Sequence, residues 1–383
     1  MSSKTVEKLS AVAALCLIIL AWVAGGLRSE GASLKRIQNI SSEIVNVTQV
    51  RPNVYEGHRA GNPKDVLYIG LATHSSYGGP LQVAVVVNSD EVIERVALVD
   101  TTDTTTYISR VLGKGVLSAF LGSPAGELPH VDAVSGATLS STAITKGVER
   151  AVTHIRGSTP VESNTPVPLE EIFRLGFITV LFIAAAIVSS KFFRWKKKYA
   201  RLSLLGIATI FLGFLWGMQP SLSTVVMFLT GVWFKGLASY TALGCLILAL
   251  VFFLCTRKNI YCAMICPFGG IQEGLGRITN CPGPKKTVWM KWTSRIFALA
   301  AVCVALYFRS PSDAEYAPFG IAFSFIGSTL IFALAIIIVV ASLFVRRPWC
   351  TLLCPAGPVF DYLAFMRRWL LPTKKNQEKT DAS

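Results

Sequence analysis

Four cysteines stand in two copies of one short pattern, and they are the residues of this chain best suited to carry chemistry. Cys262 and Cys266 form the first pair, Cys350 and Cys354 form the second, and a proline follows each pair. Thiols four positions apart on a helical turn point the same way, and the proline discourages the helix from continuing beyond it. Two equivalent pairs predict one site of four thiolates, which suits an iron–sulfur cluster or zinc. The alternatives are a redox-cycling dithiol, favoured by nearby basic residues, and two helix ends that merely contain cysteine.

A run of small and polar residues at 132–138 is the second candidate site. Its Ser135, Gly136 and Ala137 let a ligand approach the backbone, and a following helix offers its N-terminal amides to a phosphate. The Thr138 hydroxyl could carry a phosphoester to flavin mononucleotide (FMN). The alternative is an ordinary Ser/Thr cap at the start of an amphipathic helix, and the small residues taken alone favour that cap.

Long apolar runs surround these sites and predict an α-helical membrane protein. Of the 383 residues, 52% are hydrophobic, and several runs approach the roughly 18 apolar residues that a membrane span needs. The fifth run is interrupted and short. The runs predict about six transmembrane helices, at 9–27, 172–190, 202–218, 237–254, 293–308 and 327–345.

The distribution of basic residues predicts the orientation in the membrane. The loop at 191–201 carries Lys and Arg without any acidic residue, which is typical of a cytoplasmic loop. Six spans then place both termini and the two cysteine pairs on the cytoplasmic side, and residues 28–157 on the exported side. The net charge of +15 therefore reflects topology and gives no reason to expect nucleic-acid binding. The first span is either retained as a helix or cleaved as a signal peptide.

The chain divides into five parts. After the first transmembrane helix (1–27) comes an exported α+β domain (28–157), with strands expected at 66–73, 81–88 and 91–99 and helices at 107–120 and 139–155. A Pro- and Ser-rich linker (158–171) leads to a five-helix membrane domain (172–370), and a cytoplasmic tail (371–383) ends the chain. The membrane domain holds two repeated units, each with an aromatic loop, a span, a basic pair, a cysteine pair and an amphipathic helix (271–278 or 359–369). A parallel repeat about an axis along the membrane normal would bring the two cysteine pairs together.

The segment from Asp132 to Thr138 resembles the D-x-x-S-G-A-T attachment motif of the FMN-binding domain in Na⁺-pumping quinone reductases and Rnf complexes. The resemblance implies that Thr138 carries covalent FMN, transferred from FAD by a flavin transferase. A turn with Tyr77, Gly78 and Gly79 resembles the glycine-rich turn of the same domain.

This domain together with two C-x-x-x-C-P motifs is similar to the NosR/NirI family and, in size, to the C proteins encoded beside reductive dehalogenases. The resemblance covers nearly the whole chain. It departs from the longer family members in lacking a ferredoxin-like C-x-x-C-x-x-C run.

The resemblance implies an electron-transfer flavoprotein of anaerobic respiration in the bacterial cytoplasmic membrane. Electrons would pass from quinol or a cytoplasmic donor to an exported reductase, which could be a reductive dehalogenase. Because the hydrocarbon core is about 30 Å thick, thiols at the cytoplasmic face would need a further carrier, and a quinone bound near the aromatic loops at 228–234 and 319–325 is a candidate. The alternatives are a redox sensor, a maturation factor for the reductase, and a passive anchor.

Overall fold

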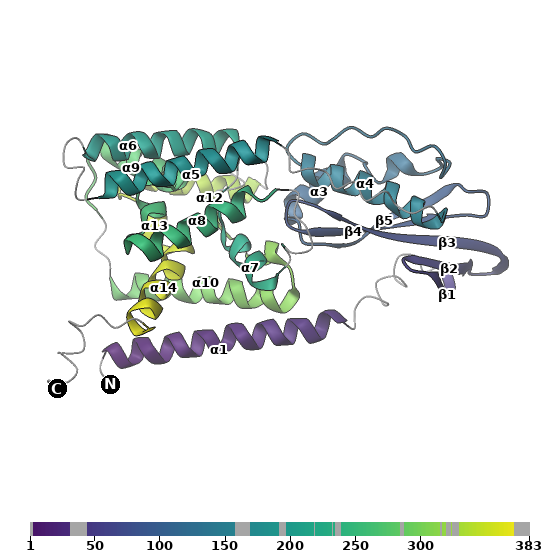
Figure 1. Cartoon of the computed structure of the whole chain (residues 1–383), viewed down its shortest axis with the longest axis horizontal. Helices are drawn as coiled ribbons and strands as arrows, with labels where there is room; N and C mark the ends of the chain where they lie inside the picture. Colours follow the sequence, from purple (N-terminus) through teal and green to yellow (C-terminus); the bar gives the residue numbers. More distant parts are fainter. Residues whose placement is uncertain are drawn as a thin grey trace.

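The computed structural model describes residues 3–30, 44–157, 169–190, 197–217, 219–231, 233, 239–283, 287–314, 316–318, 323 and 329–370. Residues 44–157 form a sheet domain that lies beyond one end of a group of long helices (Figure 1). We call the rest of the described chain the helical domain. Its proximal end faces the sheet domain, and its distal end lies opposite.

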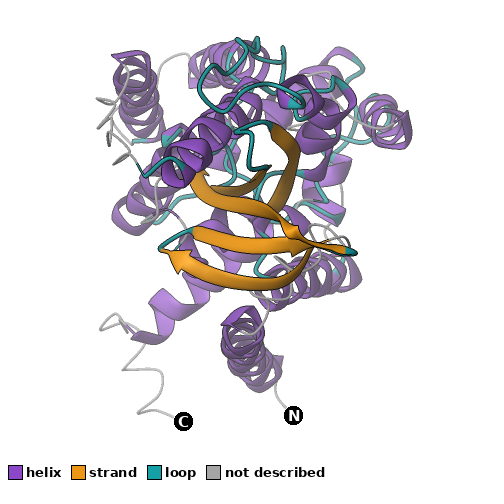
Figure 2. Ribbon diagram, turned by 90° about the vertical axis from the view of Figure 1, so that its right-hand side faces the viewer, coloured by secondary structure: helices purple, strands orange, loops and turns teal. Residues whose placement is uncertain are grey.

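The sheet domain is built on five antiparallel strands, each paired with the next in the order β1-β2-β3-β4-β5 (Figure 2). The strands are β1 (Ile44–Arg51), β2 (Val54–Arg59), β3 (Asn62–Ser75), β4 (Pro80–Val87) and β5 (Ile93–Thr101). The last three overlap the strands expected at 66–73, 81–88 and 91–99. The first two were not expected, because β1 is mostly exposed and β2 carries charged residues, so neither shows a clear apolar face.

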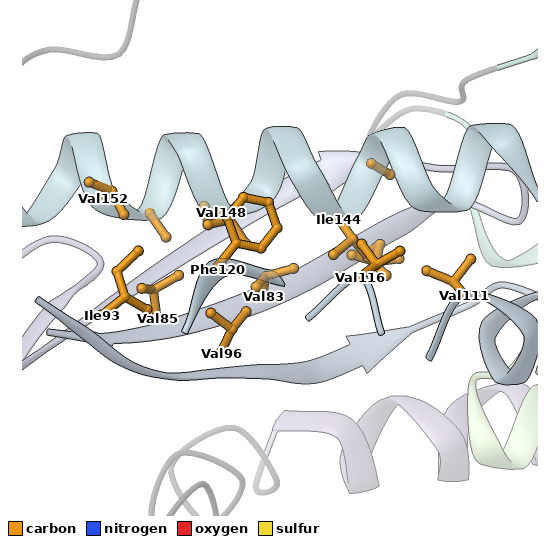
Figure 3. Close-up of a cluster of buried hydrophobic side chains, with 14 of the residues drawn as sticks. Val83, Val85, Ile93, Val96, Val111, Val116, Phe120, Ile144, Val148 and Val152 are labelled. Atoms are coloured by element: carbon orange, nitrogen blue, oxygen red, sulfur yellow. The ribbon is translucent and has the colours of Figure 1, made fainter. Parts of the chain in front are cut away.

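One face of the sheet is covered by α4 (Thr138–Ile155), which matches the helix expected at 139–155. Its Ile144, Val148 and Val152 lie against Val83 and Val85 of the sheet (Figure 3). Burial of each such side chain stabilises the domain by roughly 1.5–3 kcal/mol relative to its exposure. This packing fixes the start of α4, and so fixes the position of Thr138.

The helix expected at 107–120 is shorter in the structure. It forms as α3 (Thr105–Gly113), and a separate 3-10 turn follows at Ser118–Phe120. Gly115 between them has a φ of 72°, a left-handed conformation that a helix cannot continue through.

The helical domain contains four described helices that are long and apolar enough to cross a membrane. They are α1 (Ser3–Glu30), α5 (Leu169–Ser189), α6 (Lys197–Ala208) continued by the π-helix η2 (Thr209–Leu215), and α10 (Val288–Phe308). The two other expected spans form shorter apolar helices, α8 (Thr241–Thr256) and α12 (Thr329–Ala341). Both fall below the length of about 20 residues typical of a span. Membrane association is supported by these helices, while six spans stay a prediction.

Six shorter elements fold between or beside the long helices. They are α7 (Leu222–Thr230), η4 (Tyr261–Ile265), α9 (Pro267–Ile278), η5 (Pro311–Ala314), α13 (Pro348–Leu352) and α14 (Ala356–Leu370). The helices expected at 271–278 and 359–369 lie within α9 and α14. Pro267 is the first residue of α9, where its missing N–H costs nothing. The first proline therefore starts a new helix, and the break in the helical path lies at the preceding cysteine.

Several sequence expectations concern residues outside the described part of the chain. These are the linker at 158–168, the tail at 371–383, the basic loop at 191–196 and most of the two aromatic loops.

Candidate functional sites

Thr138 is the first residue of α4 and its side chain is exposed. The N-cap position belongs to Ala137, and no side chain caps the helix. The Thr138 hydroxyl donates only a long hydrogen bond of 3.4 Å to the Val134 carbonyl oxygen. Thr138 therefore does not play the capping role that was the alternative to flavin attachment, and its hydroxyl is accessible for modification.

An open pocket of about 480 Å³ lies beside the first residues of the motif. It is lined by Arg110, Lys114, Gly115, Val116, Ala119 and residues 131–135. Its volume falls within the range of about 300–1,000 Å³ that is usual for small-molecule sites. The two cationic side chains suit a phosphate. These features fit the phosphate of an FMN group bound at the motif.

The remaining residues of the motif form the turn into α4. Asp132, Ser135 and Gly136 are exposed, whereas Ala137 is buried in the core of the sheet domain. Gly136 has a φ of 78°, which a glycine adopts without strain. Asp132 and Ser135 line the pocket, as expected for residues beside a bound ligand.

The glycine-rich turn is tied to α4 by a carboxylate that the sequence analysis did not identify. Asp103 is buried and accepts hydrogen bonds from the Ser76 and Ser140 hydroxyls and, at 2.6 Å, from the Gly78 N–H. Burial raises the pKa of Asp103, and these three hydrogen bonds oppose that rise. The only sequence signal for Asp103 was its position in a threonine-rich tract before a helix, which carries no specific chemistry.

Two glycines are required for the shape of this turn. A Cβ atom on Gly78 would lie 2.4 Å from the Thr102 carbonyl oxygen, and Gly79 has a φ of 133°. Between Ser76 and these glycines, Tyr77 packs edge-to-face on Tyr107 with ring centroids 5.6 Å apart. The turn predicted to belong to the flavin site is thus rigid, and Asp103 links it to the helix that begins at Thr138.

The same turn contacts the proximal end of the helical domain. A small cavity of about 20 Å³ separates the two parts. From the sheet domain it is lined by Tyr77, Gly78, Thr102 and Thr104, and from the helical domain by Ser223, Thr224, Met227, Ser239, Ala242, Leu243 and Pro311. Helix α7 therefore lies directly beneath the glycine-rich turn.

The first cysteine pair lies on a hairpin that folds back between the helices. At the distal end, the Lys258 ammonium donates a 2.7 Å hydrogen bond to the Ser189 carbonyl at the end of α5. The chain then turns inward, and the Tyr261 ring stacks on Phe182 of α5 with centroids 6.5 Å apart.

This hairpin contacts the α6–η2 helix at Pro267. The Pro267 carbonyl accepts a 3.2 Å hydrogen bond from the Thr209 hydroxyl, and Thr209 begins the proximal third of the α6–η2 helix. Helix α9 then returns to the distal end, where Glu273 pairs with Arg201 at 2.6 Å. Cys266, directly before Pro267, is therefore inside the helical domain.

A side chain from the proximal end contacts the second cysteine pair. Tyr316, which follows η5 at the proximal end, donates a 3.0 Å hydrogen bond from its hydroxyl to the Leu353 carbonyl. The Cys354 carbonyl accepts a 3.1 Å hydrogen bond from Ser294 of α10. The sequence analysis placed the thiols at a membrane face, because the motifs follow basic residues. In the structure the motif segments turn back between the helices, and Arg347 of the second basic pair bonds the Cys262 carbonyl at 2.9 Å. The position of the thiols relative to a membrane face stays a prediction.

The four thiols lie close to one another. The Cys354 thiol interacts electrostatically with those of Cys262, Cys266 and Cys350. Cys266 and Cys354 also pack in one apolar cluster around Phe268. The two repeats thus contribute to one half-buried site.

The backbone of the two motifs is also alike. The Cys266 N–H bonds the Tyr261 carbonyl at 2.8 Å, and the Cys354 N–H bonds the Trp349 carbonyl at 3.0 Å. In both copies the second cysteine therefore closes a turn on the aromatic residue five positions before it. This equivalence supports the internal repeat inferred from the sequence.

The donor set of the cysteine site is made of sulfur alone. Among the residues that the structure describes, no three His, Cys, Asp or Glu side chains gather as they would around one metal ion. Thiolate donors suit zinc and iron–sulfur clusters alike.

Comparison with known protein families finds two matches, one over each of the segments that hold the candidate sites. Residues 53–153 match the FMN-binding domain family, which includes the glycine-rich turn, Asp103 and Thr138. Residues 238–289 and 327–374 match the 4Fe-4S binding domain family, one segment for each cysteine pair. No curated protein is similar enough to match the chain. The chain therefore contains an FMN-binding domain and a 4Fe-4S binding domain, an association that indicates electron transfer.

Proposed function

We propose that this protein carries electrons across the bacterial cytoplasmic membrane, from quinol or a cytoplasmic donor to an exported reductase such as a reductive dehalogenase. The two cofactor-binding domains in one chain support an electron-transfer role. The narrower kinship with NosR/NirI proteins and with the C proteins of reductive dehalogenases is part of this proposal.

The observation that carries the proposal is the position of α7 between the two candidate sites. On one side, Ser223 and Met227 of α7 line the cavity against the glycine-rich turn. On the other, Leu222 and Val225 line an apolar cavity of about 40 Å³ with Tyr261 and Pro355, the neighbours of Cys262 and Cys354. Neighbouring residues of this one 9-residue helix therefore line both cavities.

In this proposal, separate sets of residues hold the two cofactors. Thr138 anchors FMN through a phosphoester made by a flavin transferase, and Arg110 and Lys114 offset the phosphate charge. Cys262, Cys266, Cys350 and Cys354 hold the cluster, and apolar side chains around them exclude water. When bound, FMN and the cluster supply redox centres. A quinone bound near the aromatic loops at 228–234 and 319–325 would serve as the further carrier between the two sites.

The proposed orientation puts the sheet domain outside the cell and the distal end, with both termini, in the cytoplasm. Cys255 is exposed near the distal end of α8 and can report on it. We expect a membrane-impermeant maleimide to label Cys255 in inverted vesicles and not in intact cells, with Cys255→Ser as the control that identifies the labelled site. Labelling from outside intact cells would reverse the orientation and contradict export of the flavin domain.

Electron entry is tested with the purified, cofactor-loaded protein. We expect a reduced quinone, added without oxygen, to bleach the flavin absorbance, and we expect Cys266→Ser to abolish most of that bleaching. Cys303→Ser, on α10 and outside the two motifs, is the matched control. Equal bleaching in Cys266→Ser would disprove the route through the cysteine site. Flavin that is bound but not reduced by quinol would favour a sensor or maturation role.

A further inference from the structure

Gln272 of the first repeat reaches a thiol of the second. It lies on α9 and is completely buried. Its amide nitrogen Nε2 is 3.5 Å from the Cys350 sulfur and 3.4 Å from the Phe268 carbonyl oxygen. Its amide oxygen accepts a 3.2 Å hydrogen bond from the Trp349 N–H. Because a backbone N–H can only donate, the amide oxygen must face Trp349, and the NH₂ group faces the thiol.

A second contact joins the repeats, and here a residue of the second repeat bonds the first. Arg347 precedes the second motif and donates a 2.9 Å hydrogen bond to the Cys262 carbonyl oxygen. It also pairs at 2.5 Å with Glu273, the residue after Gln272. Arg201 and Arg277 pair with the same carboxylate at 2.6 and 2.7 Å. This network holds α9 in register with the second motif, so the distance from Gln272 to Cys350 is set by contacts on both sides.

The chemistry of a buried amide at a thiolate is specific. An N–H group that points at a ligand sulfur stabilises the added negative charge of a reduced cluster more than the oxidised form. Hydrogen bonds to the sulfurs are therefore among the features that set the potential of iron–sulfur centres. A neutral amide supplies this effect without bringing another buried charge, and its oxygen is already satisfied by Trp349.

We propose that Gln272 sets the reduction potential of the cysteine site, by donating its amide N–H to the Cys350 sulfur and so favouring the reduced state. This inference rests on the proposed binding of a cluster by the four cysteines. Gln272 is a positioning and tuning residue here, since it contacts a ligand sulfur and does not supply a ligand itself.

The test compares the midpoint potentials of anaerobically purified proteins, followed by electron paramagnetic resonance, after iron and acid-labile sulfide have been measured. We expect Gln272→Leu to keep the cluster and to lower the equilibrium constant for its reduction about tenfold, the order expected for one hydrogen bond to a charged group. This corresponds to about 59 mV for a one-electron couple. Gln272→Glu keeps the side-chain length and an oxygen that accepts from the Trp349 N–H, but it replaces the NH₂ donor that faces Cys350. The midpoint potential of the cluster in this variant should therefore also fall.

Ser342→Ala is the matched control. Ser342 is completely buried in the same domain, but its hydroxyl donates to the Ile338 carbonyl. The midpoint potential of the cluster in Ser342→Ala should therefore equal that of the wild type. An unchanged potential in both Gln272 variants, with iron retained, would refute the proposal. Loss of iron in both variants, but not in Ser342→Ala, would show a purely structural role and also refute it. Wild-type protein without iron would refute the cluster itself, an outcome distinct from the other two.

Discussion

Replacement of Thr138 by alanine is expected to eliminate all flavin that survives denaturation. The hydroxyl is the only atom of the side chain that can form a phosphoester, and its loss leaves the flavin transferase without an acceptor. The wild-type protein, produced together with an exported flavin transferase, should show flavin fluorescence in a denaturing gel, whereas Thr138→Ala should show none.

The structure separates this chemical effect from a folding effect. The Thr138 side chain is exposed and makes only a 3.4 Å hydrogen bond, so its removal should change the free energy of unfolding by less than about 0.5 kcal/mol. Thr145→Ala is the matched control, because Thr145 lies on the same helix and donates to the Ser141 carbonyl. Fluorescence of equal strength in Thr138→Ala and the wild type would move the attachment site elsewhere.

Loss of a single motif cysteine is expected to remove most of the bound iron and sulfide. Cys262→Ser tests the first repeat and Cys350→Ser tests the second. A serine hydroxyl is a much poorer ligand for iron than a thiolate, and a cluster held by both repeats cannot be kept by one of them alone. Anaerobically purified wild-type protein should contain iron and acid-labile sulfide, measured by chemical analysis, and each variant should contain little.

Cys303→Ser provides the comparison for the cysteine variants. Cys303 lies on α10, outside the two motifs, so its replacement should leave the iron content unchanged. Iron retained in both motif variants would mean that the repeats do not share one site. Metal-free wild-type protein, with thiols that cycle between reduced and disulfide forms, would instead support the dithiol alternative.

The two cofactor-binding domains could be predicted from the sequence, because each candidate site is defined by residue type and short spacing. The cysteine pairs and the motif ending at Thr138 are local patterns, and both matching families coincide with them. Helix α4 was also predictable, since its apolar residues recur at helical spacing and face one sheet. In contrast, β1 and β2 have no clear apolar face, so their pairing in the sheet could not be recognised from periodicity.

The tertiary structure decided how the cysteine motifs pack within the helical domain. Hydropathy and basic residues mark where apolar helices end along the chain, and they indicate a turn near Lys258. They do not show that the chain then folds back, because that depends on contacts such as Thr209 with Pro267 and Tyr316 with Leu353, which are far apart in sequence. The position of the thiols relative to a membrane face stays a prediction.

The sequence by itself thus determined which residues can carry chemistry and which helices are apolar, since both are properties of short segments. Only the tertiary structure decided what surrounds those residues. Asp103 joins the glycine-rich turn to α4, α7 lies between the two sites, and Gln272 meets Cys350 across the repeats. The physical reason is that a buried polar side chain must find its partner in space, and that partner leaves no pattern in the residues beside it.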